Sequence, residues 1–276
     1  MQELTYISSR NNPCVKKYAK LSDKKYCESE QLFLIEGIKL FEEVIECGIP
    51  LEAVLFLEEK INNFRIIQAY NKAREKNEFS NVDFYCLSES AFSKISSEKA
   101  PEGVICVAKT LDNLNFYNKI DRNNLLEYED EKIMMLFSLR DPGNVGTVIR
   151  SALAFGFDRI IMSSDSANLY NVRTVRAAMG ALFKIKIDIV SDFISAIETI
   201  KDSGRRVFCA ELRENAKSLD DIDVKKSDCF IIGNEGHGIP PEVSKKCTGS
   251  VYIPISKNSE SLNAAIAASV IAFVQK

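Results

Sequence analysis

Apolar stretches of two kinds alternate along the chain. Short continuous runs such as "LEAVLFL" and "DCFIIGN" are typical of buried strands. Between them, segments such as "IKLFEEVIECG" and "DFISAIETIKDSG" place apolar residues three and four positions apart, which predicts helices with one buried face. Strands that alternate with helices predict an α/β fold with mostly parallel sheets covered on both faces.

The first hundred residues predict a small α/β unit. Its expected strands cover residues 31–37, 51–57, 82–88 and 103–109, and its expected helices cover 12–21, 38–48 and 62–77. The polar, Asn/Asp-rich segment "TLDNLNFYNKIDRNNLLEYEDEK" follows without strong periodicity and predicts a linker. We therefore expect an N-terminal domain over 1–108, a linker over 109–130 and a second domain over 131–276.

The second half predicts a larger α/β unit. Its expected strands cover 132–139, 158–164, 183–190, 205–212, 228–234 and 250–256. Its expected helices cover 144–156, 171–182, 192–204, 240–247 and 259–276. Ligands of parallel sheets bind beyond the carboxyl ends of the strands. The loops after "LFSL", "FIIG" and "YIPI" therefore carry the candidate chemistry.

Composition narrows the class of protein. The chain has 276 residues, 46% of them hydrophobic, which is enough for a sizeable core and argues against disorder. No run approaches the roughly 20 apolar residues of a membrane span, and "MQELTYISSR" lacks the apolar segment of a signal peptide. Eight cysteines without a C-x-x-C pair, and one histidine, give little support to a zinc site. We expect a cytoplasmic protein with reduced thiols, no metal and no membrane association.

Charge is informative through its distribution. The net charge of -3 gives no direct support for nucleic-acid binding. The segment "ISSRNNPCVKKYAKLSDKK", however, carries six basic side chains against Asp23 alone. This segment supplies phosphate contacts or is a solvated helix face, and charge alone leaves both interpretations open.

The loop "LRDPGNVG" follows the first strand of the second half. A helix is expected to begin near Asn144, a favoured N-cap residue, where backbone N–H groups are free to meet an anion. Arg150 shares one helical face with Gly143 and Gly146, so a phosphate or ribose could approach its guanidinium. The alternative is a capped helix in which Arg150 pairs with Asp141.

The loop "GNEGHGIPP" holds the sole histidine, His237. Its glycines follow the order G-x-x-G-x-G, the reverse of the dinucleotide fingerprint, so a nicotinamide site is disfavoured. Glycine lets a ligand approach the backbone closely, and Glu235 is a plausible orienting group. A bare glycine-rich turn is the alternative.

The last loop leads into the C-terminal helix. Ser261 and Asn263 lie near its expected start. The expected core stripe is Leu262, Ile266, Val270 and Phe273. Four alanines, Ala264, Ala265, Ala267 and Ala268, keep the rest of the helix slim, so that it packs closely against a neighbour within or between chains.

Together these loops resemble the motifs of the SpoU/TrmH family of RNA ribose methyltransferases. The first motif, N-x-G-x-x-x-R, corresponds to Asn144, Gly146 and Arg150. The second, G-x-E-x-x-G, corresponds to Gly233, Glu235 and Gly238. The third, I-P…S-L-N, corresponds to Ile253, Pro254, Ser261, Leu262 and Asn263. The first half, through "ISSRNNPCVKKYAKL" and "FLIEGIKLFEEVIECG", resembles the substrate-binding domain of many members.

The resemblance implies a fold, a cofactor and partners. The implied fold is a parallel-sheet α/β domain with a trefoil knot, preceded by a small α/β RNA-binding domain. The implied enzyme is a homodimer that uses S-adenosylmethionine to methylate a ribose 2′-hydroxyl of structured RNA, with 23S ribosomal RNA as the expected substrate. Two members of the same architecture stay open as alternatives: a drug-resistance ribose methylase, and a non-catalytic RNA- or ribosome-binding protein that retains the knot.

The resemblance also implies roles for particular residues. The expected catalytic residues are Asn144, Arg150, Glu235, Ser261 and Asn263. The expected cofactor-binding residues are Gly233, Asn234, Gly238, Ile239, Ile253 and Leu262. The expected RNA-binding residues are Arg10, Asn12, Lys16, Lys17 and Arg176. His237 falls on a variable position of the second motif, so we expect no catalytic role for it.

Two positions depart from the family pattern. The third motif commonly has a glycine near Lys257, and many members have serine where this chain has Ala178. Neither departure removes a motif residue, although the first affects the rim of the last loop.

Overall fold

The computed structural model describes residues 4–117, 128 and 131–275. The chain forms two compact units, Met1–Leu111 with Asn168–Phe183, and Asp112–Ala167 with Lys184–Lys276. The domain borders expected at residues 108 and 131 stay a prediction. Most of the expected linker lies outside the described residues.

The first unit is built on a five-stranded mixed sheet. Its strands are β1 (Thr5–Ile7), β2 (Leu32–Glu36), β3 (Leu51–Leu57), β4 (Asp83–Leu87) and β5 (Val104–Lys109). Its helices are α1 (Pro13–Ala19), α2 (Lys24–Glu30), α3 (Ile38–Cys47), α4 (Phe64–Glu75), α5 (Glu89–Phe92) and α7 (Val172–Ala178). The strand order is β1-β4-β3-β5-β2; β1, β4 and β3 are parallel, and β5 is antiparallel to β3 and β2.

Local sequence explains where these helices end and why some short elements were not expected from the sequence pattern. Helix α3 ends where Gly48 adopts a left-handed backbone with φ of 66°, a conformation that glycine enters without steric cost. Strand β1 and helices α2 and α5 were not expected. Strand β1 and helix α5 are too short for a periodic pattern, and α2 is a polar segment in which Cys27 is the one buried residue. Helix α7 ends four residues before the expected border, where Met179 takes a left-handed φ of 48°.

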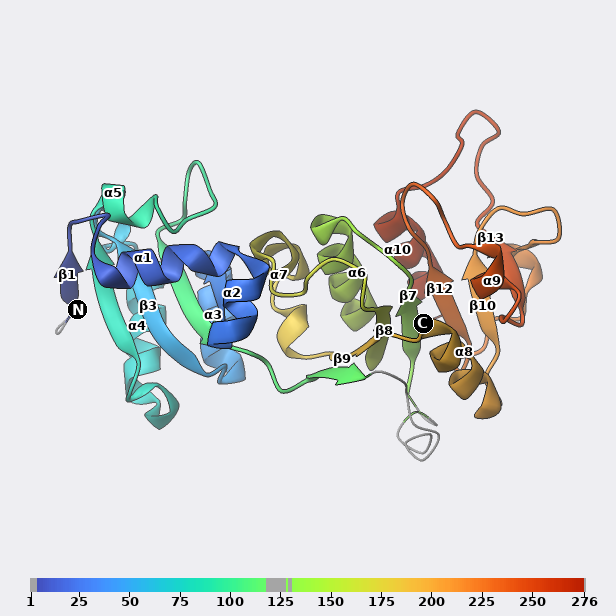
Figure 1. The fold of residues 1–276 in the computed structure, drawn as a ribbon, viewed down its shortest axis with the longest axis horizontal. Coiled ribbons are helices and arrows are strands. Elements are labelled where there is room, and N and C mark those ends of the chain that lie inside the picture. Colours follow the sequence, from blue (N-terminus) through green and yellow to red (C-terminus); the bar gives the residue numbers. More distant parts are fainter. Residues whose placement is uncertain (1–3, 118–127, 129–130, 276) are drawn as a thin grey trace. The chain divides into compact units, whose positions relative to one another are not determined.

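The second unit is built on an eight-stranded sheet in which every recorded pairing is parallel. Its strands are β6 (Leu114–Tyr117), β7 (Ile133–Leu136), β8 (Arg159–Ser163), β9 (Lys186–Val190), β10 (Val207–Ala210), β11 (Lys217–Ser218), β12 (Cys229–Ile232) and β13 (Gly249–Tyr252). Its helices are α6 (Pro142–Ala154), α8 (Phe193–Asp202), α9 (Pro241–Ser244) and α10 (Ala264–Val274). The order β11-β13-β10-β12-β7-β8-β9-β6 confirms the expected parallel α/β sheet (Figure 1).

Two strands of this sheet were not expected. Strand β6 lies inside the segment 109–130 that was expected to be a linker, and it pairs with β9 at one edge of the sheet. Strand β11 pairs with β13 at the other edge. Both are edge strands: β11 has two residues, and β6 (LNFY) is interrupted by Asn115, so neither shows the apolar run that marks a buried strand.

Helix α6 begins earlier than expected. Asp141, not Asn144, is the N-cap residue, and its Oδ1 accepts a hydrogen bond from the Asn144 N–H at 2.9 Å. Pro142 occupies the first helical position, where its fixed φ suits the helix and its missing N–H costs nothing. The side chain of Asn144 is therefore free of capping and available to other loops.

Helix α10 differs from expectation in both its start and its buried face. It begins at Ala264 with Asn263 as N-cap, so residues 259–262 belong to the preceding loop. The expected core stripe was wrong: Ile266 and Phe273 are each 53% exposed. The buried residues are Ala265, Ala268, Ile271 and Ala272. Small side chains let α10 lie close to its neighbours, which leaves the larger apolar side chains outside.

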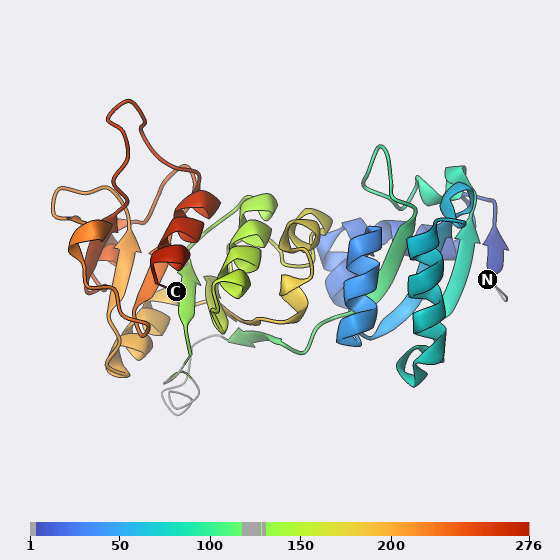
Figure 2. The same cartoon turned by 180° about the vertical axis from the view of Figure 1, so that it is seen from behind.

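Helices α6 and α10 lie side by side in both views (Figures 1 and 2). Ser269 Oγ donates to Ser151 Oγ at 2.8 Å between them. The rings of Phe155 and Phe273 meet edge to face at 5.9 Å. This pairing fixes the start of α6 and the start of α10 near each other, and both starts carry candidate site residues.

Candidate functional site

The Glu235 carboxylate joins two of the expected loops. Its Oε1 accepts hydrogen bonds from the Asp141 backbone N–H at 3.0 Å and from Asn144 Nδ2 at 2.9 Å. Its Oε2 accepts from the Arg140 backbone N–H at 3.1 Å. Both oxygens are thus engaged by donors of the loop after β7 and of the first turn of α6, and the carboxylate holds these segments in place.

The same contacts fix the protonation of Glu235. Partial burial raises the pKa of its carboxyl, but the hydrogen bonds from Asn144, Asp141 and Arg140 outweigh burial, so the pKa lies below its ordinary value. Glu235 is therefore an anion at neutral pH. An anion whose oxygens already accept three hydrogen bonds is suited to positioning other groups and poorly suited to taking a proton.

Asn144 also binds the third loop. Asn263 Nδ2 donates to Asn144 Oδ1 at 3.0 Å, while Asn263 Oδ1 caps α10 by accepting from the N–H groups of Ala265 and Ile266. The hydrogen-bonded chain Glu235–Asn144–Asn263 links one residue of each motif. The structure thus brings together three of the five expected catalytic residues.

The remaining two, Arg150 and Ser261, are exposed. Arg150 lies one helical turn after the buried Gly146. Among the described residues, no hydrogen bond or ion pair involves the Arg150 side chain, so the alternative pairing with Asp141 is wrong. Ser261 lines the cavities described below. Both side chains are accessible to a ligand.

The loop around His237 is closed by Asn234. Asn234 Oδ1 accepts hydrogen bonds from the N–H groups of Gly236 and His237 at 3.0 and 2.9 Å, and Asn234 Nδ2 donates to the Ser138 carbonyl at 2.7 Å. The imidazole of His237 is exposed, and its Nδ1 lies 3.2 Å from Asn234 Oδ1. Its recorded contacts stay inside its own loop, and its expected lack of a catalytic role stays a prediction.

Gly233 is required by close packing. A Cβ at this position would lie 2.5 Å from Ile239 Cγ1 and 2.9 Å from the Gly238 carbonyl carbon. Gly238 itself has a positive φ of 64°. Gly236 differs, because a Cβ there would meet only Asn234 Oδ1, at 3.7 Å. The loop therefore needs glycine at the motif positions and tolerates a side chain between them.

Sequence reasoning missed a supporting network behind the loop after β7. Ser138 has a left-handed φ of 50°, rare for serine. Its N–H donates to Ser163 Oγ at 2.7 Å, and its Oγ donates to Asp165 Oδ2 at 2.7 Å. The Arg140 guanidinium donates to Asp165 Oδ2 at 3.2 Å. Serines and an aspartate scattered over two loops give no local sequence signal.

Two adjoining cavities lie beside these loops at the carboxyl ends of β10, β12 and β13. Their volumes are about 690 and 320 Å³, and they share the residues Ala210, Ser261, Leu262 and Ala267. The larger one has an apolar wall that includes Leu212 and Ile253, and the smaller one reaches Glu235. This size, with an apolar wall and a few polar groups, suits a nucleoside-sized cofactor.

Most expected cofactor-binding residues line these cavities. Gly233, Asn234, Gly238 and Leu262 line the smaller one, and Ile253 and Leu262 the larger one. Ile239 lines neither; it is 3% exposed and packs in the core of the unit. Lys257 lies in the wall of the larger cavity, where the family commonly has glycine nearby.

The carboxyl end of β10 is a wall that sequence reasoning missed. Ala210, Glu211 and Leu212 line the larger cavity. The signal was present, because "RRVFCAEL" was expected to be a strand of the same parallel sheet. Ligands bind at the carboxyl ends of parallel strands, so β10 was as good a candidate as the three strands whose loops were expected to carry the chemistry.

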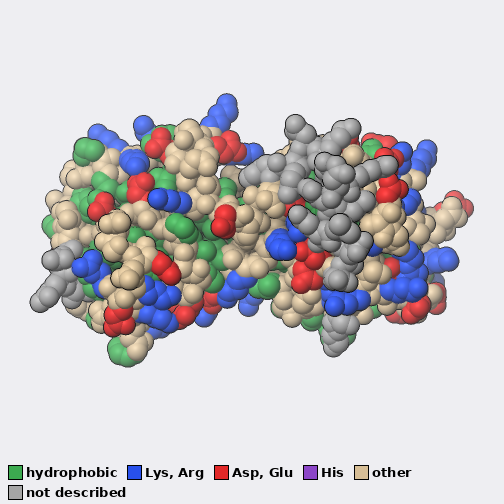
Figure 3. Space-filling view, turned by 90° about the horizontal axis from the view of Figure 1, so that it is seen from below, with side chains coloured by type: hydrophobic (Ala, Val, Ile, Leu, Met, Phe, Trp, Pro, Cys, Tyr) green, Lys and Arg blue, Asp and Glu red, His purple; other side chains and the backbone are tan. Residues whose placement is uncertain are grey.

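The expected RNA-binding residues all lie in the first unit, and they differ in availability. Asn12 caps α1, and Lys17 pairs with Glu52 at 2.7 Å. Arg176 pairs with Glu98. Among the described residues no ion pair involves Arg10 or Lys16. Basic and acidic side chains are interspersed on the face drawn in Figure 3, so charge alone does not mark an RNA surface there.

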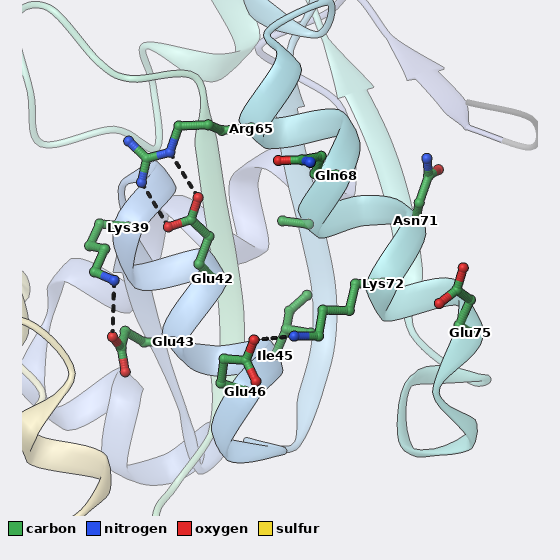
Figure 4. Close-up of a pocket in the computed structure, with 11 residues that line it drawn as sticks. Lys39, Glu42, Glu43, Ile45, Glu46, Arg65, Gln68, Asn71, Lys72 and Glu75 are labelled. Carbon is green, nitrogen blue, oxygen red and sulfur yellow. Dashed lines mark hydrogen bonds and ion pairs between the residues drawn. The ribbon is translucent and has the colours of Figure 1, made fainter.

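A further cavity of about 640 Å³ lies in the first unit between α3 and α4 (Figure 4). Its walls carry the ion pairs Arg65–Glu42, Lys39–Glu43 and Lys72–Glu46. Alternating paired charges of both signs are typical of a solvated helix surface. None of the expected site residues lines this cavity.

The described part of the chain contains no helix that is both long and apolar enough to cross a bilayer. Within the same residues, no three or more His, Cys, Asp or Glu side chains are grouped so as to hold a metal ion.

Known proteins match both halves of the chain. Residues 131–273 match the SpoU rRNA methylase family, and residues 12–106 match the MRM3-like substrate binding domain. Among curated relatives, the 23S rRNA (guanosine(2553)-2′-O)-methyltransferase RlmP of Bacillus subtilis is 29% identical over 267 residues, which cover 97% of each chain.

Solved structures match over the full length. An AdoMet-bound rRNA methyltransferase from Sinorhizobium meliloti has a TM-score of 0.79 at 25% identity, covering 99% of this chain and 97% of that one. A crystal structure of an RNA 2′-O ribose methyltransferase has a TM-score of 0.80 at 24% identity and covers 98% of each chain. The family match spans more than half of the chain and confirms the resemblance seen in its motifs. The chain belongs to the SpoU rRNA methylase family.

Proposed function

We propose that this protein transfers a methyl group from S-adenosylmethionine to a ribose 2′-hydroxyl of 23S ribosomal RNA. The observation that carries the proposal is the chain Glu235–Asn144–Asn263, which links three family motifs beside two adjoining cavities. The RlmP relative, 29% identical over nearly the whole chain, supports the substrate. The trefoil knot expected from the resemblance, and the cytoplasmic location expected from the composition, are part of the proposal.

The cavities fit the proposed cofactor. Bound S-adenosylmethionine supplies an electrophilic methyl group on a sulfonium. The apolar wall of the larger cavity, with Leu212, Ile253 and Leu262, would hold the adenosyl portion. Gly233 and Gly238 let the backbone of the second motif approach the ligand closely.

The polar residues would then orient the acceptor ribose. Methyl transfer needs the attacking oxygen in line with the methyl carbon and sulfur, which is mainly a matter of positioning. Glu235 anchors Asn144 and the loop of Arg140 and Asp141, and we assign it a positioning role. Asn144, Asn263 and Ser261 would present amide and hydroxyl groups to the ribose.

Arg150 would bind the phosphate beside the target ribose. Its guanidinium is exposed and has no recorded partner among the described residues, so it is available for a bidentate contact. A guanidinium pKa above about 12 makes it a poor base. The proton of the 2′-hydroxyl would therefore pass to that phosphate or to water.

Dimerisation is the second part of the proposal. On the outer face of α10, the side chains of Phe273 and Ile266 are each 53% exposed and that of Val274 is 45% exposed. Large apolar side chains on one helix face are costly in water and are commonly covered by a partner. Because every copy carries this face, we propose that a second copy of the chain covers it.

The first unit would deliver RNA. Residues 12–106 match a substrate binding domain, and the first unit exposes the cations Arg10 and Lys16. Lys94 joins them, because its Nζ lies 3.2 Å from the Arg10 carbonyl oxygen. Phosphate contacts of this kind predict RNA binding that weakens steeply with salt.

Mapping of ribose methylation tests the proposal. Ribosomal RNA from cells with and without the gene is digested, and 2′-O-methylated positions are compared by mass spectrometry. We expect one 23S position to lose its methyl group and regain it when the gene is restored. The guanosine equivalent to the position methylated by RlmP is the first to examine. An unchanged methylation map would contradict the proposal.

A further inference from the structure

We propose that Cys209 and Cys247 form a redox-active dithiol, which an oxidant of the peroxide class converts into an internal disulfide. All eight cysteines of the chain carry free thiols in this structure. The inference concerns the fold of the second unit and does not depend on methyl transfer.

The two thiols are already in contact. Cys209 Sγ lies 3.2 Å from Cys247 Sγ. Cys209 is on β10, and Cys247 lies between α9 and β13, the strand that pairs with β10. The backbone beside Cys247 is held there, because the Thr248 N–H donates to the Val207 carbonyl at 2.7 Å. A disulfide bond of about 2.05 Å needs an approach of only about 1 Å.

The environment gives the two thiols different roles. Cys247 is partly exposed, and the hydrogen bond with Cys209 lowers the pKa of its thiol; the nearby charge of Lys201 acts in the same direction, against burial and Glu211. Cys209 is fully buried, and its hydrogen bond with Cys247 together with burial raises the pKa of its thiol. The thiolate is the reactive form of cysteine, so Cys247 attacks the oxidant and Cys209 resolves the product.

The chemistry balances in two steps. The Cys247 thiolate attacks one oxygen of the peroxide ROOH; the O–O bond breaks, and with one proton the products are a sulfenic acid and the alcohol ROH. The Cys209 thiol then attacks the Cys247 sulfur, the S–O bond breaks, and water leaves. Two thiols are thereby oxidised to one disulfide, and one peroxide is reduced to alcohol and water.

Two buried cysteines on other strands, Cys229 and Cys106, lack this combination. Cys229 is fully buried on β12, and burial raises the pKa of its thiol to about 12. Cys106 is buried on β5, where burial likewise raises its pKa. Neither has an exposed, more acidic thiol recorded as a hydrogen-bond partner, so a peroxide should act on them slowly.

The disulfide would clamp the segment between α9 and β13 onto β10. Helix α9, which leads into that segment, contacts the cavity wall: Oγ of its last residue, Ser244, donates to Glu211 Oε1 at 2.6 Å, and Glu211 lines the larger cavity. Closing the chain between Cys209 and Cys247 restricts the unfolded state. We therefore expect the oxidised protein to unfold at a temperature higher by about 5 °C.

Peptide mapping under non-reducing conditions tests this inference. Reduced full-length protein is treated with one equivalent of hydrogen peroxide, remaining thiols are blocked, and the digest is analysed by mass spectrometry. We expect a cross-linked Cys209–Cys247 peptide that dithiothreitol cleaves, together with the rise in unfolding temperature. Cys247→Ser should lose both, whereas Cys86→Ser, at a partly buried cysteine of the first unit, should retain both.

Two results would overturn the proposal. One is oxidation of Cys247 to sulfinic acid without a cross-link in wild-type protein whose circular dichroism stays native. The other is a cross-linked peptide that joins Cys209 or Cys247 to a different cysteine. Cys247→Ser replaces a partly exposed side chain, so the test does not rely on a variant that disrupts the core.

Discussion

Asn263 Nδ2 donates a hydrogen bond to Asn144 Oδ1 at 3.0 Å, although 119 residues separate them. Asn144 in turn donates to Glu235, 91 residues away. Each residue closes a different loop: the Asn263 side chain caps α10, and the Glu235 carboxylate holds the backbone before α6. The site therefore depends on the packing of three loops, and a change in any one should disturb the others.

Glu235→Gln tests the positioning role. Glutamine keeps the size of the side chain. Its NH₂ group, however, cannot accept the hydrogen bonds that one carboxylate oxygen of Glu235 accepts in the wild type. Hydrogen bonds to a charged group are each worth about 1.5–3 kcal/mol, so kcat should fall by about 10- to 100-fold. Single-turnover methylation measures this loss, and His237→Gln is the control, because the recorded contacts of His237 stay in its own loop.

The pKa of Glu235 adds a test in acid. A carboxyl group whose pKa is lower in the folded state contributes stability above its unfolded pKa, about 4.3, and loses it as pH falls through the folded value. The unfolding temperatures of wild type and Glu235→Gln should thus differ at pH 7 and converge as the pH falls through the lowered pKa of the folded state. A difference that stays constant with pH would show that charge at Glu235 is unimportant.

Arg150→Lys should lower methylation by about 100-fold or more while cofactor affinity changes only a few-fold. Lysine keeps the charge but lacks the planar fork that can hold a phosphate and a ribose together. Isothermal titration with S-adenosylhomocysteine and a methylation assay separate the two effects. An active Arg150→Lys enzyme would show that a single positive charge is sufficient.

Gly233→Ala should weaken cofactor binding by at least about 10-fold. The added methyl group would overlap Ile239 and the Gly238 backbone, and such overpacking typically costs 1–3 kcal/mol. Gly236→Ala in the same loop is the matched control, because its methyl group would meet only Asn234 Oδ1 at 3.7 Å. Equal affinities for the two variants would mean that loop shape does not govern the cofactor site.

Phe273→Glu should convert a dimer to a monomer. A carboxylate on the exposed face of α10 would be buried without a partner in the proposed interface. Phe64→Glu is the matched control, because Phe64 is 70% exposed on α4 of the first unit. Sedimentation velocity at micromolar concentration distinguishes the species; a monomeric wild type would refute dimerisation through α10.

The positions of most strands and of the three site loops followed from the sequence, because buried parallel strands carry apolar runs and their carboxyl ends share one edge, whereas the short strands β1, β6 and β11 were missed. The contact between Asn144 and Asn263 could not follow from spacing, since it depends on how α6 and α10 pack. The buried face of α10 was wrong for a related reason. Ile266 and Phe273 outweigh the alanines in a hydrophobicity pattern, whereas close packing favours the alanines inside.

Transfer of a labelled methyl group to purified 23S rRNA tests the central claim most directly. The RNA is incubated with S-adenosylmethionine labelled in its methyl group, and its nucleosides are then identified by mass spectrometry. We predict label in one 2′-O-methylated nucleoside, lost by at least about 100-fold in Asn144→Ala while S-adenosylhomocysteine binding stays within a few-fold. Label on a base, or an Asn144→Ala enzyme as active as wild type, would contradict the account.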